Sequence, residues 1–321
     1  MKKIGITTTI PVEIVFSANM IPVDLNNIFI TSQNPGELVR NAEYEGYPRN
    51  SCGWIKGIYS SIKNKEVDAL IAVVAGDCSQ TQAMIETLNG DIEIIPFEYP
   101  YTRDKNQLKK QFENLINSLN TTWDNVLIWQ KRLDKIRAKV WELDRLTWQE
   151  NAIKSFDNHY YQVCCSDFNS DPEKFEKELD EKLDNTHNKY DDGIRLGYIG
   201  VPPIYTDIYS FIESLGARVV FNEVQRQFSL PYKTDDILEK YLLYTYPYDV
   251  QGRIADIKNE IEKRNLHGII HYTQSFCFRQ ILDIVIRKNI DIPILTIEGD
   301  SPSPLDARTK LRIESFLEML R

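Results

Sequence analysis

The chain has 321 residues, of which 42% are hydrophobic and 26% are charged, and its formal net charge is -9. This length allows two domains with sizeable cores. The acidic balance argues against broad nucleic-acid binding, because contacts with phosphates need clustered lysine and arginine. No apolar run approaches the ~20 residues that span a bilayer, and Pro11 interrupts the beginning before any signal-peptide core forms. Five cysteines make a poor disulfide framework. We therefore expect a cytoplasmic protein.

In the first hundred residues, apolar runs alternate with helical periodicity, which predicts βα units and a mostly parallel sheet. Pro11 suits the first position of a helix, and Asn50 or Ser51 suits the cap of a later one. The expected strands are residues 4–9, 22–25, 67–74 and 92–96. The expected helices are residues 12–18, 50–62 and 81–88.

Strand signals vanish between residues 104 and 190, where charged helical periodicity covers 108–119, 123–151 and 171–190. After residue 190, apolar runs again alternate with helical periodicity. The expected strands are residues 194–200, 218–221, 268–272 and 292–297. The expected helices are residues 204–215, 250–264, 278–288 and 306–320, with an irregular stretch at 232–248. We predict an α/β fold with two Rossmann-like (flavodoxin-like) parallel-sheet lobes, residues 1–103 and 192–321, and a helical insert or clamp at 104–191.

Three cysteines, Cys52, Cys78 and Cys277, each stand beside the end of a predicted strand or helix. In open α/β sheets, ligands bind outside the carboxyl ends of the strands. Cys52 opens a predicted helix, whose dipole lowers the pKa of a thiol and favours the thiolate. Three thiolates meeting between the lobes would form a metal or iron–sulfur site one ligand short of closure. The alternative for each cysteine is that it packs as a small hydrophobic residue.

Cys164 and Cys165 are adjacent, so their side chains point apart, and we predict core packing for both. The four histidines show no metal-binding spacing and are expected to be structural. The sequence contains no nucleophile elbow, no Walker loop and no dinucleotide fingerprint. We therefore do not expect nucleotide phosphates to be bound by a standard loop.

Short motifs occur in a fixed order along nearly the whole chain. They are Thr9-Ile10-Pro11-Val12-Glu13, Ile21-Pro22-Val23, Asn50-Ser51-Cys52 with Lys56-Gly57, Gly76-Asp77-Cys78, Gly197-Tyr198-Ile199-Gly200-Val201-Pro202-Pro203, Gln274-Ser275-Phe276-Cys277 and Ile297-Glu298-Gly299-Asp300 with Arg308 and Arg312. In this order they resemble the 2-hydroxyacyl-CoA dehydratase and benzoyl-CoA reductase subunits.

The resemblance implies that Cys52, Cys78 and Cys277 each ligate one iron of a [4Fe–4S] cluster and leave the fourth iron open. It implies an oxygen-sensitive lyase that eliminates water from a 2-hydroxyacyl-CoA thioester through a ketyl radical. The motifs place Glu13, Ser79 and Glu298 as catalytic candidates near the cluster, with Asp77 and Gln274 beside them.

The resemblance also implies partners: an ATP-dependent iron–sulfur activator protein that donates the electron, and a second subunit in a homodimer or in a heterodimer with a paralogue. One alternative is an ATP-coupled low-potential reductase, of the benzoyl-CoA reductase type or with an [8Fe–9S] double cubane. A double cubane with three thiolates on each half needs six cysteines, whereas five are present. The same motifs would also fit a non-catalytic cluster-carrying subunit, and the fold alone would fit a two-lobe ligand-binding protein with buried cysteines.

Overall fold

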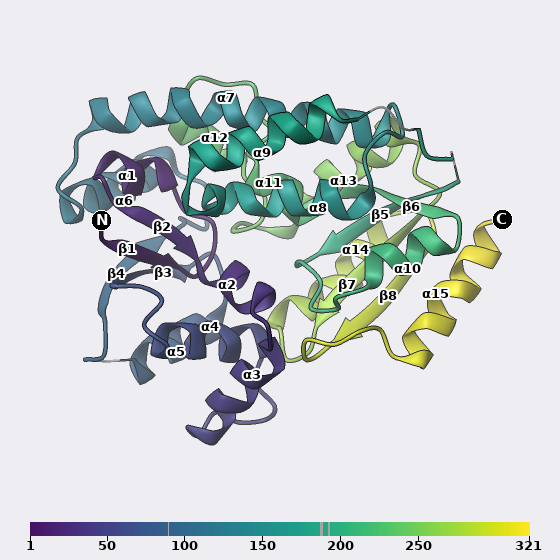
Figure 1. Ribbon diagram of the computed structural model, residues 1–321, viewed down its shortest axis with the longest axis horizontal. Coiled ribbons are helices and arrows are strands. Elements are labelled where there is room, and N and C mark those ends of the chain that lie inside the picture. The colour runs from purple at the N-terminus through teal and green to yellow at the C-terminus, as the bar shows by residue number, and fades with distance from the viewer. Residues whose placement is uncertain (89, 187–188, 192) are drawn as a thin grey trace.

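The structure is a computed structural model that describes residues 1–88, 90–186, 189–191 and 193–321. Two four-stranded parallel sheets lie toward opposite ends of the molecule (Figure 1). The strand order is β2–β1–β3–β4 in the first sheet and β6–β5–β7–β8 in the second. Both sheets therefore follow the flavodoxin-like order, in which the strand order reverses beside the first strand of each lobe. The predicted α/β fold with two parallel-sheet lobes is confirmed.

The strands of both sheets alternate with helices along the chain. The first sheet consists of β1 (Lys3–Ile6), β2 (Ile21–Asp24), β3 (Ala69–Ala75) and β4 (Glu93–Glu98). The second consists of β5 (Ile194–Gly200), β6 (Ala217–Asn222), β7 (Gly268–Gln274) and β8 (Ile294–Gly299). All seven residues of β7 are buried, as is typical of a central parallel strand that is covered on both faces.

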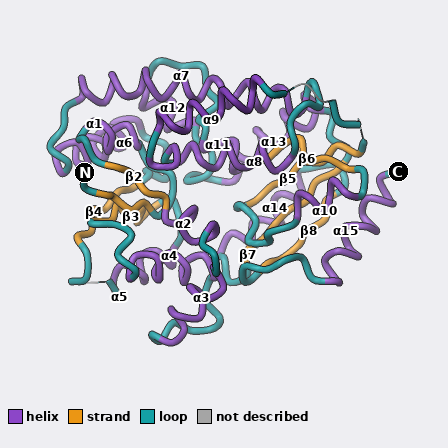
Figure 2. Tube along the Cα trace, in the orientation of Figure 1, coloured by secondary structure: helices purple, strands orange, loops and turns teal. Residues whose placement is uncertain are grey.

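Helices cover both faces of the first sheet: α1 and, from the segment that follows this lobe, α6 (Lys105–Ser118) lie on one side, and α4 and α5 lie on the other (Figure 2). Successive residues of β3 pack alternately against the two faces, because successive side chains of a strand point to opposite faces of the sheet. Ile71 and Val73 join the hydrophobic cluster that contains α1 and α6 residues, whereas Leu70 and Ala72 join the cluster that contains α4 residues. The helices of this lobe are α1 (Val12–Ser17), α2 (Leu25–Thr31), α3 (Pro35–Tyr44), α4 (Gly53–Lys63) and α5 (Ser79–Thr87).

A helical segment follows β4 and packs against both lobes. Its elements are α6 (Lys105–Ser118), α7 (Trp123–Trp148), α8 (Ser155–Val163), η1 (Cys164–Ser166), η2 (Phe168–Ser170) and α9 (Pro172–Asp184). As predicted, the described residues between 104 and 190 contain no strand. Helix α7 runs along the molecule and contacts α1 in the first lobe and β6 in the second (Figure 1). The division of the chain at residues 103 and 191 stays a prediction.

The second lobe contains α10 (Ile208–Ser214), α11 (Glu223–Phe228), α12 (Ile237–Leu243), α13 (Val250–Arg264), η3 (Phe278–Leu282), α14 (Asp283–Asn289) and α15 (Ala307–Leu320). None of the helices in the described ranges combines the length and the apolar character needed to cross a lipid bilayer.

Several local predictions were wrong. The cap of α4 is Cys52 and not Asn50 or Ser51, and Pro11 caps α1 instead of occupying its first helical position. The stretch at 232–248 contains α12, which Asp236 caps by accepting two backbone N–H bonds. Helix 278–288 is divided into η3 and α14, and helices α2, α3, α8 and α11 were not predicted. Most of the missed helices are short, and tertiary contacts stabilise short helices more than their own periodicity does.

Candidate iron–sulfur site between the lobes

A cavity that is partly open to solvent lies between the two lobes, with about 990 Å³ of empty space when its open mouth is included. The segments that follow β1, β3, β5 and β7 contribute to its wall. These strands flank the points where the strand order reverses in the two sheets, which is where open α/β folds bind their ligands. The cavity therefore uses the binding edge of both lobes at once.

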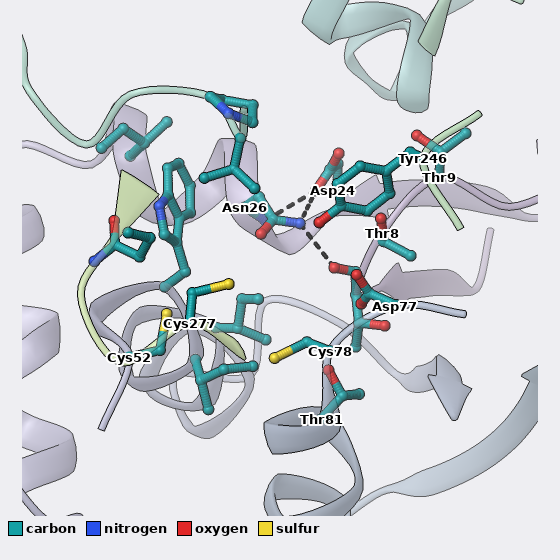
Figure 3. A pocket seen from close by; sticks show the side chains of 18 of the residues that line it. Thr8, Thr9, Asp24, Asn26, Cys52, Asp77, Cys78, Thr81, Tyr246 and Cys277 are labelled. Atoms are coloured by element: carbon teal, nitrogen blue, oxygen red, sulfur yellow. Dashed lines mark hydrogen bonds between the residues drawn. The ribbon is translucent and has the colours of Figure 1, made fainter. Parts of the chain in front are cut away.

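Cys52, Cys78 and Cys277 all line this cavity (Figure 3). Each is the N-cap of a helix with extended backbone: Cys52 caps α4, Cys78 caps α5 and Cys277 caps η3. Two come from the first lobe and one from the second, as the sequence suggested. The Cys52 side chain is buried, whereas Cys78 and Cys277 are half-buried. Their role as cluster ligands stays a prediction at this point.

The side chain of Gln80 connects the backbone beside the cysteines. Its Oε1 accepts a hydrogen bond from the backbone N–H of Cys52 at 3.0 Å, and its Nε2 donates to the carbonyl of Phe276 at 2.8 Å. Gln80 itself lies two residues after Cys78, so one amide joins three cysteine loops. Phe276 has a φ of 63°, which is uncommon for an aromatic residue. Sequence reasoning missed Gln80, and its closeness to Cys78 was the one signal that pointed to it.

Burial keeps the three thiols protonated. It raises the pKa of Cys52 to about 11, and the nearby Cys277 adds to the rise. Burial, followed by the charge of Asp77, raises the pKa of Cys78 to about 12. The backbone N–H groups at the start of α4 lower the pKa of Cys52 by less than burial raises it. The prediction that the helix dipole favours a thiolate at Cys52 is therefore wrong, because desolvation outweighs the dipole.

Asp77, which directly precedes Cys78, lies beside Arg279 and Tyr246. Burial raises the pKa of Asp77 to about 6, although the positive charge of Arg279 opposes the rise. The guanidinium of Arg279 stacks 4.2 Å from the centre of the Tyr246 ring and donates to the carbonyl of Gly76 at 3.3 Å. The basic group of the cavity wall is thus held in place by an aromatic face and a backbone oxygen.

Four residues of the cavity wall carry a buried polar atom that has no hydrogen-bond partner in the described structure. These atoms are Asn27 Nδ2, Trp54 Nε1, Thr81 Oγ1 and His159 Nδ1. Burial lowers the pKa of His159 to about 3, so its imidazole is neutral near pH 7. Buried polar groups are normally paired, so these unpaired atoms are positions at which a bound ligand could make hydrogen bonds. His159 was expected to be structural, and only the fold places it here.

The three predicted catalytic residues do not line the cavity. The Glu13 carboxylate is buried and pairs with Arg137. The exposed Ser79 begins α5, and the exposed Glu298 accepts a hydrogen bond from Ser275 at 2.7 Å. Their catalytic roles stay predictions.

Asp77 and Gln274 both line the cavity. The motifs placed these two residues beside the catalytic candidates. Cys164 and Cys165 are buried in the hydrophobic core, as predicted, and neither lines the cavity.

Within the described residues, no three His, Cys, Asp or Glu side chains converge closely enough to hold one metal ion. A single ion needs its donors around one point. A cubane differs, because it takes one thiolate at each of several irons, so its ligands are separated by the width of the cluster. Three thiols around one cavity fit such a group in number and in chemical type.

A family model described as "2-hydroxyglutaryl-CoA dehydratase, D-component" matches residues 7–320. No curated protein matches the chain. The family match includes both lobes, the helical segment and all three cysteine loops of the cavity. The chain therefore belongs to the 2-hydroxyglutaryl-CoA dehydratase D-component family.

Proposed function

We propose that this protein is a catalytic component of a 2-hydroxyacyl-CoA dehydratase and that Cys52, Cys78 and Cys277 hold a [4Fe–4S] cluster with one open iron. The observation that carries the proposal is that three helix-capping cysteines from two lobes line one cavity. Thiolates are the usual protein ligands of such clusters. Because all three thiols have raised pKa values, formation of the cluster has to release their protons.

The proposed reaction removes water from a 2-hydroxyacyl thioester. Its β-hydrogen is not acidic, so ordinary base-promoted elimination fails. A cluster held by Cys52, Cys78 and Cys277 would supply one-electron reduction and a Lewis-acidic iron, which is the chemistry that loss of the 2-hydroxyl needs. The cavity is partly open to solvent, so a small molecule can enter it. Its unpaired polar atoms offer partners to the oxygens of the acyl group.

The electron is proposed to come from a separate ATP-dependent iron–sulfur activator protein. The component itself would work as a homodimer or as a heterodimer with a paralogous subunit. A double cubane with three thiolates on each half is not favoured, because only three of the five cysteines line the cavity and Cys164 and Cys165 are buried in the core. The catalytic roles predicted for Glu13, Ser79 and Glu298 are not required by this proposal.

The test is an anaerobic preparation of wild-type protein and of Cys52→Ala, Cys78→Ala and Cys277→Ala, with iron, acid-labile sulfide and EPR spectra measured. Wild type should contain about four irons per chain, and each variant should lose or destabilise the cluster. Cys164→Ala and Cys165→Ala are matched controls that should keep it. Equal loss of iron in the controls, or an iron-free and stably folded wild type, would contradict the assignment.

A second measurement tests the reaction. Wild type, supplied with an activator, ATP, a reductant and a 2-hydroxyacyl-CoA, should form the enoyl-CoA. If it instead reduces an acyl or aryl substrate with ATP consumed for each electron, the reductase alternative replaces the dehydratase. If it holds a cluster and catalyses neither reaction with its paralogue present, the cluster-carrying alternative is favoured.

A further inference from the structure

Asp24 lies in the cavity wall, and the fold anchors one of its two carboxylate oxygens (Figure 3). It is the last residue of β2 and only 4% exposed. Its Oδ1 accepts both the backbone N–H and the side-chain N–H of Asn26 at 2.9 Å, which caps α2. The Ser166 hydroxyl also hydrogen-bonds the carboxyl and lowers its pKa. Both Asn26 bonds fall on Oδ1, and a carboxylate oxygen that meets a single hydroxyl can still bond to a ligand, so Oδ2 is the oxygen left for one.

A second carboxyl lies directly behind Asp24. Asp167, in the loop between η1 and η2, is also 4% exposed, and its Oδ2 accepts the backbone N–H of Asp24 at 2.8 Å. Its Oδ1 accepts the backbone N–H of Asn169 at 2.9 Å. Within the described part of the chain, no lysine, arginine or histidine pairs with either carboxyl. The other titratable groups that interact with Asp24 are Asp77 and Cys164, and both become negative on ionisation.

Two buried carboxyls without a cation cannot both ionise cheaply. Burial, followed by the charge of Asp24, raises the pKa of Asp167 to about 7. Burial raises the pKa of Asp24 as well, against the Ser166 hydroxyl and the hydrogen bonds of Asn26. The pair therefore retains one proton near neutral pH, and its titration belongs to the pair and not to either residue.

We propose that Asp24 is the catalytic acid and base of the cavity and that Asp167 is the positioning residue that keeps a proton on it. This inference rests on the proposed dehydration. The proton on Oδ2 passes to the 2-hydroxyl as the carbon–oxygen bond breaks, and water leaves. The resulting Asp24 carboxylate then accepts the β-proton as the carbon–hydrogen bond breaks. The carboxyl ends as it began, so protons balance over one turnover.

The wall around Asp24 is consistent with a ligand in this position. Thr81, only 1% exposed, lines the same cavity and has an unpaired Oγ1. If Asp24 served only as the cap of α2, asparagine would replace it without loss, because its side-chain oxygen accepts the same hydrogen bond. Asp24→Asn therefore separates the two roles: it keeps the cap and removes the proton.

The first experiment needs neither cluster nor substrate. Wild type, Asp24→Asn and Asp167→Asn are labelled with [¹³C]aspartate, and the carboxyl signals are followed against pH by NMR. Asp77, whose pKa is raised to about 6, should titrate in all three proteins. We expect a second carboxyl that titrates near neutral pH in wild type and is absent from that range in both variants. Far-UV circular dichroism of Asp24→Asn should match that of wild type, because the cap is retained.

The second experiment measures turnover in the holoenzyme with its activator. Asp24→Asn should lose about 100-fold or more in enoyl-CoA formation, with iron content, EPR spectrum and substrate binding unchanged. Asp167→Asn should lose less of its enoyl-CoA formation than Asp24→Asn does. Its pH–rate profile should have the basic limb shifted to lower pH, because the negative charge that holds the proton on Asp24 is gone.

Two results overturn the inference: wild type in which Asp77 is the one carboxyl that titrates near neutral pH, or Asp24→Asn with turnover within a few-fold of wild type. A wild type that shows the titration and does not dehydrate the thioester overturns the proposed function instead.

Discussion

Glu13 was predicted to be catalytic from its motif, and the structure gives it a buried ion pair. It lies in the first turn of α1, and its Oε1 accepts from the Arg137 guanidinium of α7 at 2.7 Å. Its Oε2 accepts from the Tyr241 hydroxyl of α12 at 2.9 Å. The side chains of Glu13 and Arg137 are 0% and 1% exposed. One carboxylate therefore joins three helices from distant parts of the chain.

Glu13→Gln removes the negative charge and keeps the shape of the side chain. The Arg137 guanidinium then retains only Asp134, at 3.1 Å, and that carboxylate is 26% exposed. Breaking a buried pair while one charge stays buried costs roughly 3–5 kcal/mol. Because Asp134 compensates in part, we expect the free energy of unfolding to fall by about 3 kcal/mol. The double variant Glu13→Gln/Arg137→Met should lose less than the sum of its single variants, with a coupling of about 2 kcal/mol.

The assay is urea unfolding at neutral pH, followed by far-UV circular dichroism. Glu173→Gln is the matched control, because Glu173 pairs with Arg132 on the same helix α7 but is 80% exposed. That change should have little effect, since solvent screens an exposed pair. The cluster EPR signal and the turnover per folded Glu13→Gln molecule should match wild type. If Glu13→Gln unfolds with wild-type stability and has lost its turnover, Glu13 is catalytic and the structural account of the ion pair fails.

Two more predictions concern hydrogen bonds elsewhere in the molecule. Gln80→Ala removes the amide that joins the cysteine loops, so this variant should retain less iron than wild type during anaerobic gel filtration. Gln82→Ala, on the same helix, is the control and should retain as much iron as wild type. Equal iron retention in the two variants would show that Gln80 does not support the site. Burial opposes ionisation of Glu223, but the charge and hydrogen bonds of Arg253, at 2.6 and 2.9 Å, hold its pKa below the usual range. Its contribution to stability is therefore present above that range and is lost as the pH falls below about 4. Urea unfolding between pH 7 and pH 3 should show this loss in wild type and a flatter profile in Glu223→Gln/Arg253→Met; parallel profiles would contradict it.

Local patterns in the sequence were sufficient for the architecture. The apolar run of β3 and the alternation around β5 and β7 predict parallel strands, because a strand covered on both faces must be apolar throughout. The positions of Cys52, Cys78 and Cys277 beside strand ends then predict a shared site, because the carboxyl ends of parallel strands lie at one edge of a sheet. Neither step needs a contact between residues that are far apart in sequence.

Long-range contacts were decided by the tertiary structure alone. Asp24 and Asp167 are separated by 143 positions, and Gln80 and Phe276 by 196, so no periodicity connects them. The protonation of the cysteine thiols was mispredicted for a related reason. A helix dipole can be inferred from a cap position, but desolvation depends on everything that packs around the sulfur. The sequence determined which chemical groups are present and the strand ends at which they stand. Only the packing of the two lobes determined which groups lose their water, and with it which carboxyls and thiols retain a proton.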